Sequence, residues 1–104
     1  MEAIEKIREI LEQTNLPVAY ESFTKDETPP LPFICYTNPE DNNFAADGTV
    51  YHSSKVIHVE LYTEKRDLEI EKAVEAVLSA FFYEKTAIYL NDEKCYEILY
   101  ELEV

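Results

Sequence analysis

Residues 55–82 read KVIHVELYTEKRDLEIEKAVEAVLSAFF, and this stretch decides the fold because a strand pattern is followed directly by a helix pattern. Ile57, Val59 and Leu61 alternate with polar residues, which is the signature of a strand with one buried face. Asp67 follows a short charged break. We expect it to be the N-cap of a helix, because its carboxylate can accept the free N–H groups of the first turn.

The helix after Asp67 is expected to bury one side against the sheet. Its apolar residues recur at helical spacing and form one stripe: Ile70, Ala73, Val74, Val77, Leu78, Phe81 and Phe82. The opposite side carries Glu69, Lys72 and Glu75, which we expect to be solvated.

The rest of the chain supplies one more helix and three more strands. An amphipathic helix is predicted at the N-terminus, with Ile7 and Leu11 on its apolar side and an end near Pro17, because proline disfavours helical geometry in the residue before it. Strands are predicted at residues 18–23, 33–37 and 95–104, and polar connections at residues 25–32 and 83–94, the second with a short extended piece at 87–90.

The predicted order is therefore α-β-β-β-α-β. This is an α+β fold, a small antiparallel or mixed sheet with two helices packed on one face. A chain of 104 residues is expected to form a single domain, residues 1–104.

The composition excludes several classes of protein. Apolar residues make up 46% of the chain, which is too many for a disordered protein. The 9 Lys and Arg stand against 22 Asp and Glu, a net charge of −13, and this argues against a nucleic-acid clamp. The acidity is explained either by solubility or by a surface that repels DNA, mimics it or docks a basic partner.

The same composition suggests where the protein works. The sequence has no long apolar run for a membrane span, and its N-terminus is too polar for a signal peptide. Cys35 and Cys95 lie in strand-like runs and are expected to be reduced, partly buried thiols. A cytoplasmic protein is the expectation.

Residues able to carry out catalysis are few. His58 and Glu60 share one face of their strand and could hold a metal ion or relay a proton, but a metal site needs three or four ligands. The run 41–48 fails the spacing of a calcium loop, and a single glycine excludes a phosphate-cradling loop. The sequence predicts neither an enzyme nor a cofactor.

Contact surfaces are better supported than a catalytic site. The irregular stretch 38–48 is longer than an ordinary hairpin loop, and long loops on rigid scaffolds often bind partners. The eight tyrosines either fill a thin core or contribute to an interface, where tyrosine is enriched. We expect a mixed outer face of the sheet to be formed by His58, Glu60, Tyr62, Glu97, Leu99 and Glu101.

A series of motifs along the chain carries a resemblance to a known family. The motifs are PFICY at 32–36, NFAAD at 43–47, VELYTEKRD at 59–67, FYEK at 82–85 and EKCYEILYELEV at 93–104. In this order they resemble the small tail terminator proteins (tail-completion, or head–tail joining, proteins) of long-tailed phages and prophages of Gram-positive bacteria. The resemblance covers nearly the whole chain.

The resemblance implies a structural virion protein without catalytic residues. Such subunits are α+β proteins that form a homo-oligomeric ring, commonly a hexamer, which caps the tail tube and meets the head–tail connector. DNA passes through the ring without specific binding. The location is the host cytoplasm during assembly and then the virion tail, with no membrane. The contact residues implied or expected are Asp41, Asn42, Asn43, Phe44 and Asp47 in the loop, with His58, Glu60 and Tyr62 on the sheet.

Two other classes of function stay open at this point. The first alternative is an acidic binding module that mimics DNA or inhibits a basic host protein. The second is a small enzyme that uses His58 and Glu60.

Overall fold

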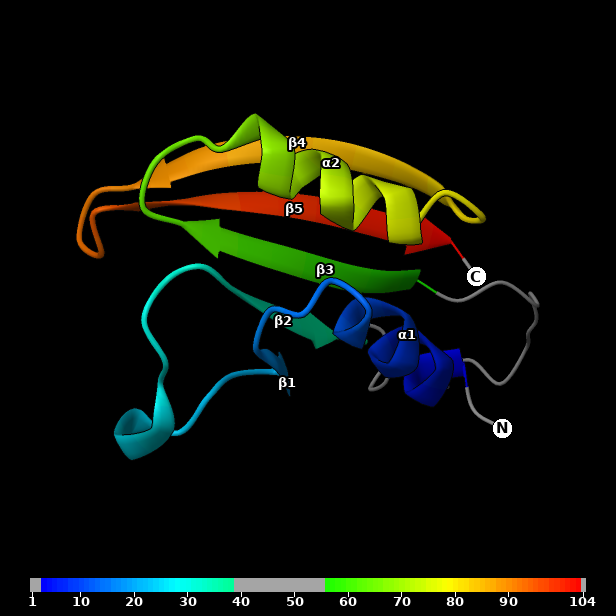
Figure 1. Ribbon diagram of the computed structural model, residues 1–104, viewed down its shortest axis with the longest axis horizontal. Coiled ribbons are helices and arrows are strands. Elements are labelled where there is room, and N and C mark those ends of the chain that lie inside the picture. The colour runs from blue at the N-terminus through cyan, green and yellow to red at the C-terminus, as the bar shows by residue number, and fades with distance from the viewer. Residues whose placement is uncertain (1–2, 39–55, 104) are drawn as a thin grey trace, which may run out of the picture.

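The computed structural model describes residues 3–38 and 56–103, which form a five-stranded mixed sheet and two α-helices (Figure 1). The elements are α1 (Ala3–Glu12), β1 (Val18–Tyr20), the 3₁₀ turn η1 (Lys25–Glu27), β2 (Phe33–Thr37), β3 (Val56–Thr63), α2 (Leu68–Val77), β4 (Phe82–Leu90) and β5 (Cys95–Glu103). The strand order is β1-β2-β3-β5-β4. β1 runs parallel to β2 and the other neighbours are antiparallel, so the predicted α+β class is confirmed.

The core lies between one face of the sheet and the two helices. β3 alternates as predicted, with Ile57, Val59 and Leu61 buried. Both helices contribute to the same cluster, and Figure 1 shows them on the same side of the sheet. The cluster consists of Ile7 and Leu11 from α1, Val74 and Leu78 from α2, and Ile34, Tyr36, Ile57, Val59, Leu61, Ile98, Tyr100 and Leu102 from the strands.

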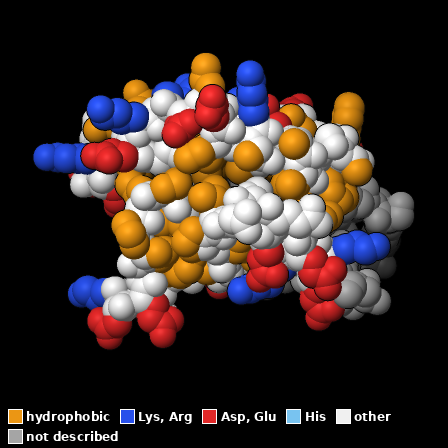
Figure 2. Space-filling view, viewed as in Figure 1, with side chains coloured by type: hydrophobic (Ala, Val, Ile, Leu, Met, Phe, Trp, Pro, Cys, Tyr) orange, Lys and Arg blue, Asp and Glu red, His pale blue; other side chains and the backbone are white. Residues whose placement is uncertain are grey.

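The two helices do not hide this side of the sheet completely. Figure 2, which views the same side as Figure 1, shows hydrophobic side chains gathered near the middle of this face and charged side chains mostly around its margin. Tyr20 and Leu68, which are 40% and 62% exposed, are among the large apolar residues left accessible.

Single residues determine where α1 ends and where α2 begins. Asn15 has φ 66°, the left-handed geometry that asparagine tolerates just after a helix, and Thr14 Oγ1 donates to the Leu11 carbonyl at 2.7 Å. At the start of α2 the Asp67 carboxylate accepts a hydrogen bond from Ile70 N at 3.2 Å, so the predicted N-cap is confirmed.

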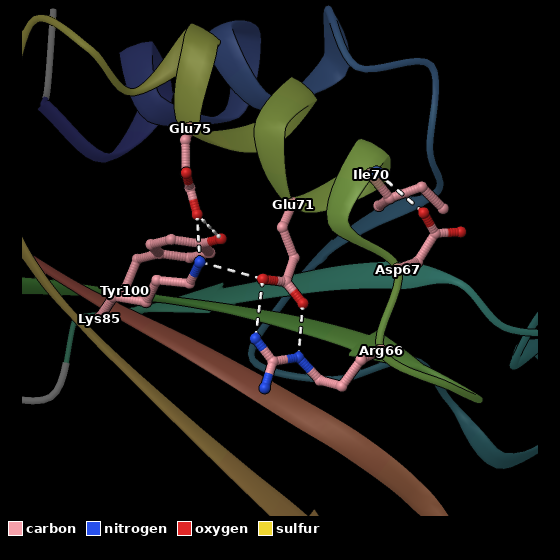
Figure 3. Close-up of polar contacts among 7 residues, drawn as sticks. All are labelled: Arg66, Asp67, Ile70, Glu71, Glu75, Lys85 and Tyr100. Carbon is pink, nitrogen blue, oxygen red and sulfur yellow. Dashed lines mark hydrogen bonds and ion pairs between the residues drawn. The ribbon is translucent and has the colours of Figure 1, made fainter.

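A buried carboxylate fixes α2 against the sheet (Figure 3). Glu71 is 1% exposed although it carries a charge, and burying a charge is costly unless it is paired. Arg66 donates to both carboxylate oxygens, from Nε at 2.8 Å and Nη2 at 3.1 Å, and Lys85 Nζ lies 3.0 Å from Oε1. The Arg66 guanidinium, opposed in part by burial and assisted by Lys85, holds the pKa of Glu71 below its usual value.

The same cluster continues along the helix to β5. Lys85 Nζ also lies 2.6 Å from Glu75 Oε2, and the Tyr100 hydroxyl donates to that oxygen at 2.8 Å. Glu75 was expected on a solvated side, and this expectation is wrong for it. The helix is rotated so that Glu71 and Glu75, one turn apart, both face the sheet.

β4 is missing from the predicted order, in which residues 83–94 form a polar connection. The structure instead has a strand at Phe82–Leu90, so the order is α-β-β-β-α-β-β. Phe82, expected in the apolar stripe of the helix, begins this strand and is 80% exposed. Because β4 lies at the edge of the sheet and is mostly exposed, apolar and polar residues occur on both of its faces and its period-two pattern is weak.

The strand expected at 18–23 is shorter than predicted. β1 ends at Tyr20 because Glu21 adopts φ 69°, outside the strand region. The predicted loop residues Asp41, Asn42, Asn43, Phe44 and Asp47 lie outside the described residues.

We expect Glu71→Gln to lower the free energy of unfolding by about 2 kcal/mol, because it removes a buried charge that accepts three charged hydrogen bonds. Urea denaturation followed by circular dichroism measures the change. Glu69→Gln, at an exposed position of the same helix, is the matched control and should cost a few tenths of a kcal/mol. Equal effects of the two substitutions would show that the buried ion pairs of Glu71 do not stabilise the fold.

The pH dependence of this difference follows from the lowered pKa of Glu71. A carboxylate with a folded pKa below its unfolded value of 4.5 stabilises the fold fully above pH 4.5 and loses this effect as the pH falls through the folded pKa. The stability gap between the wild type and Glu71→Gln should therefore be constant near neutral pH and shrink below pH 4.5. A gap that does not change between pH 7 and pH 3 would show that the ion pairs contribute nothing.

Candidate functional site

The face of the sheet opposite the helices is the candidate functional site, and we call it the outer face. Residues directly opposite one another in neighbouring strands share a face, so the strand register assigns its members. They are Phe33, Cys35 and Thr37 in β2, Val56, His58, Glu60 and Tyr62 in β3, Cys95, Glu97, Leu99, Glu101 and Glu103 in β5, and Phe82, Glu84, Thr86, Ile88 and Leu90 in β4. This set includes all six residues that the sequence predicted for an outer face.

One corner of the outer face is closed by aromatic residues. The Phe23 ring, from the segment before β2, packs edge-on against Phe33 with centroids 5.2 Å apart, and Phe33 contacts Tyr62 at 5.3 Å. Cys35 lies in this corner and is 4% exposed. Burial, with the nearby Glu60 carboxylate, raises the pKa of the Cys35 thiol to about 11. The thiol is therefore protonated near neutral pH and is a poor nucleophile.

His58 and Glu60 share the outer face, as predicted, but each has a different partner. His58 Nε2 lies 3.2 Å from Glu101 Oε2, on the residue directly opposite in β5. The Tyr62 hydroxyl donates to Glu60 Oε1 at 2.9 Å. Burial and then the Glu60 carboxylate raise the pKa of Tyr62, so its hydroxyl stays a donor.

Carboxylates dominate the open part of the outer face. Glu84 and Glu101 lie directly opposite each other, and Glu103 follows on the same side of β5. Burial, with the charge of Glu60 as a second cause, raises the pKa of Glu97. The members of the outer face include no Lys or Arg, so the described strands present an acidic surface whose one basic group is the imidazole of His58.

Apolar groups lie among these acids. Leu99 is partly exposed at the centre of the face, between Glu60 on β3 and Thr86 on β4. Ile88 is 45% exposed beside Glu97. The described part of this face therefore mixes carboxylates with aliphatic and aromatic side chains.

Sequence reasoning missed the pairs formed across strands. The His58–Glu101 contact and the opposed Glu84 and Glu101 depend on the strand register, which no local pattern specifies. The only available signal was the alternation in β5, which placed Glu101 on the correct face.

Within residues 3–38 and 56–103, no three His, Cys, Asp or Glu side chains are placed to share a metal ion. Neither helix in these ranges is long and apolar enough to cross a membrane. Comparisons with protein-family models, with curated proteins and with solved structures find no match for this chain. The functional argument therefore rests on the geometry of the outer face.

We expect Glu97→Gln to stabilise the protein at neutral pH by about 0.5 kcal/mol, because it removes a half-buried charge close to Glu60. An acid whose folded pKa is raised destabilises the fold above that pKa, and the cost disappears below the unfolded pKa near 4.5. The gain in stability should therefore shrink as the pH falls toward 4.5. Its sign is opposite to that of Glu71→Gln, which destabilises the protein. Glu103→Gln is an exposed control on the same strand with the same change in net charge, and thermal unfolding across pH compares them. A gain from Glu103→Gln as large as that from Glu97→Gln would mean that only net charge matters.

Proposed function

We propose that this chain is a structural subunit of a phage tail, a tail terminator that forms a ring, caps the tail tube and joins it to the head connector. One observation carries the proposal: the outer face, over β3, β5 and β4, has no helix on it in the described part of the chain. A sheet with one open face of mixed acidic and apolar character is suited to assembly with other subunits.

The side chains on this face that could take part in catalysis favour a structural role instead. The Cys35 thiol is buried and its pKa is raised to about 11. His58 contacts Glu101 on β5, and Glu60 accepts a hydrogen bond from Tyr62 on its own strand, so both side chains already have partners within the sheet. The His58–Glu101 contact links β3 to β5.

Electrostatics fit the passage of DNA through such a ring. The net charge of −13 repels phosphate, and like charges release no counterions on approach. A ring also needs a heterologous contact, in which one surface of a subunit meets a different surface of the next. The molecule offers two unlike faces, the acidic outer face and the face that bears the helices with its exposed hydrophobic groups (Figure 2).

The proposed partners are other copies of the chain, which form a hexameric ring on the tail, together with the tail tube protein and the head connector.

A second candidate is an acidic binding module that mimics DNA toward a basic protein. It is favoured by the direct opposition of Glu84 and Glu101, since adjacent carboxylates are destabilising in a sheet unless something positive binds them. A stable monomer that competes with DNA for a basic protein would favour this candidate over the ring.

Negative-stain electron microscopy of the concentrated protein tests the ring directly. We expect closed rings from the wild type, and a loss of rings from Leu99→Asp, because it adds a charge at the centre of the outer face. Leu68→Asp makes the same substitution at a leucine that is 62% exposed on the face that bears the helices, the proposed partner surface, and should also weaken the rings. Circular dichroism checks that both variants are folded. Rings that survive Leu99→Asp would exclude the outer face as the ring contact.

A further inference from the structure

The edge of the sheet formed by β4 is the longest unprotected feature of the described chain. β4 ends the strand order and pairs with β5 on one side (Figure 1). In an edge strand, alternate backbone N–H and C=O groups point away from the sheet and can pair with another strand. β4 offers nine residues of such backbone, whereas the opposite edge, β1, has three.

The side chains of β4 do little to block pairing. Charged side chains commonly protect natural sheet edges. β4 has two charged residues, Glu84 and Lys85, and the ammonium group of Lys85 is held by Glu71 and Glu75 under α2 (Figure 3). Large apolar side chains are exposed along the strand, with Phe82 at 80% and Tyr89 at 45%.

We propose that β4 pairs with β4 of a second copy of this chain, antiparallel, about a two-fold axis that passes beside Thr86. Two β4 strands match in length, nine residues against nine, and the two sheets become one continuous sheet. A pairing of β4 with β1 of another copy would leave most of β4 without a partner, since β1 is Val18–Tyr20.

The charges of β4 select this register. With Thr86 at the axis, Glu84 lies opposite Ile88 of the second copy. In the same register Lys85 lies opposite Ala87 of the second copy, so no two like charges face each other. Centring the pair on Glu84 or on Lys85 would set each charge against its own copy, which is destabilising. Centring it on Ala87 would leave the first two residues of each strand unpaired.

The same register brings compatible side chains together on both faces. On the outer face Thr86 meets Thr86 of the second copy, and Phe82 meets Leu90 of the second copy at both ends. On the face that bears the helices Tyr83 meets Tyr89 of the second copy. Threonine pairs and aromatic or aliphatic pairs directly opposite each other are favourable across antiparallel strands. The contact is self-complementary, as a two-fold interface must be.

This pairing goes beyond the proposed ring, since a two-fold contact closes on itself and cannot generate a ring alone. Its test is therefore separate. Opposed Cα atoms in antiparallel strands are about 4.5–5.5 Å apart, within the reach of a disulfide. Two copies of residue 88, by contrast, would be offset by four residues, or roughly 13 Å.

We therefore expect Thr86→Cys to form a disulfide-linked pair of chains under mild oxidation. Ile88→Cys, on the same strand and face, should not, and neither should the wild type, whose Cys35 and Cys95 are buried. Non-reducing electrophoresis detects the disulfide-linked pair, and circular dichroism confirms that both variants are folded. Sedimentation equilibrium of the wild type should show a reversible pair whose population rises with concentration.

Three results would overturn the proposal: a wild type that stays monomeric at all concentrations, Ile88→Cys linking as fast as Thr86→Cys, or neither variant linking. If neither variant links while rings appear by microscopy, the edge pairing is wrong and the proposed ring stands. If Thr86→Cys alone links and no rings appear, the edge pairing stands and the ring is wrong.

Discussion

The buried carboxylate of Glu71 is the charge on which the arrangement of the molecule depends. Its partners come from two other segments, Arg66 from the connection after β3 and Lys85 from β4. Within the sheet β4 pairs only with β5, so the ion pairs of Lys85 with Glu71 and Glu75 give this edge strand a second attachment, to α2. A well-packed apolar group could be as stable at this position, since buried ion pairs are often no better than hydrophobic contacts. What the ion pairs supply is geometry, because a bidentate arginine and a shared lysine fix the rotation of α2 about its axis.

With both helices on one side, the opposite side of the sheet has to meet water or a partner. Carboxylates lie on that side. Because the pKa of Glu97 is raised, its negative charge lowers the stability of the fold at neutral pH. A face selected for solubility alone would not need half-buried acids beside Leu99 and Ile88. In the proposed assembly, Leu99 and Ile88 are apolar groups of this face that a partner surface would cover.

The sequence predicted the parts of the fold that have clear periodicity. β3 and β5 alternate because one face is fully buried, and Asp67 caps α2 as its position indicated. β4 could not be predicted in the same way, because an exposed edge strand has no need to keep apolar residues on one face. The burial of Glu71 could not be predicted from the sequence either. A glutamate beside an apolar stripe is expected to be solvated, and only the tertiary structure brings Arg66 and Lys85 to it. For the candidate site, the alternation gave the correct face of all six predicted residues, but the partners across strands required the register.

The two edges of the sheet constrain how larger assemblies can grow. If two β4 strands pair about a two-fold axis, both long edges are consumed and the remaining edges are the two β1 strands, each of three residues. Such short edges give little backbone pairing, so further growth through sheet edges stops at the pair. A ring would then have to be built through faces, with the acidic outer face or the helix-bearing face in contact with a different surface of the next copy. Because the outer face is strongly negative, two outer faces would repel each other, and its partner in a ring must be a less acidic surface. The face that bears the helices, with hydrophobic side chains gathered near its middle, is the described surface of this subunit that meets that requirement (Figure 2).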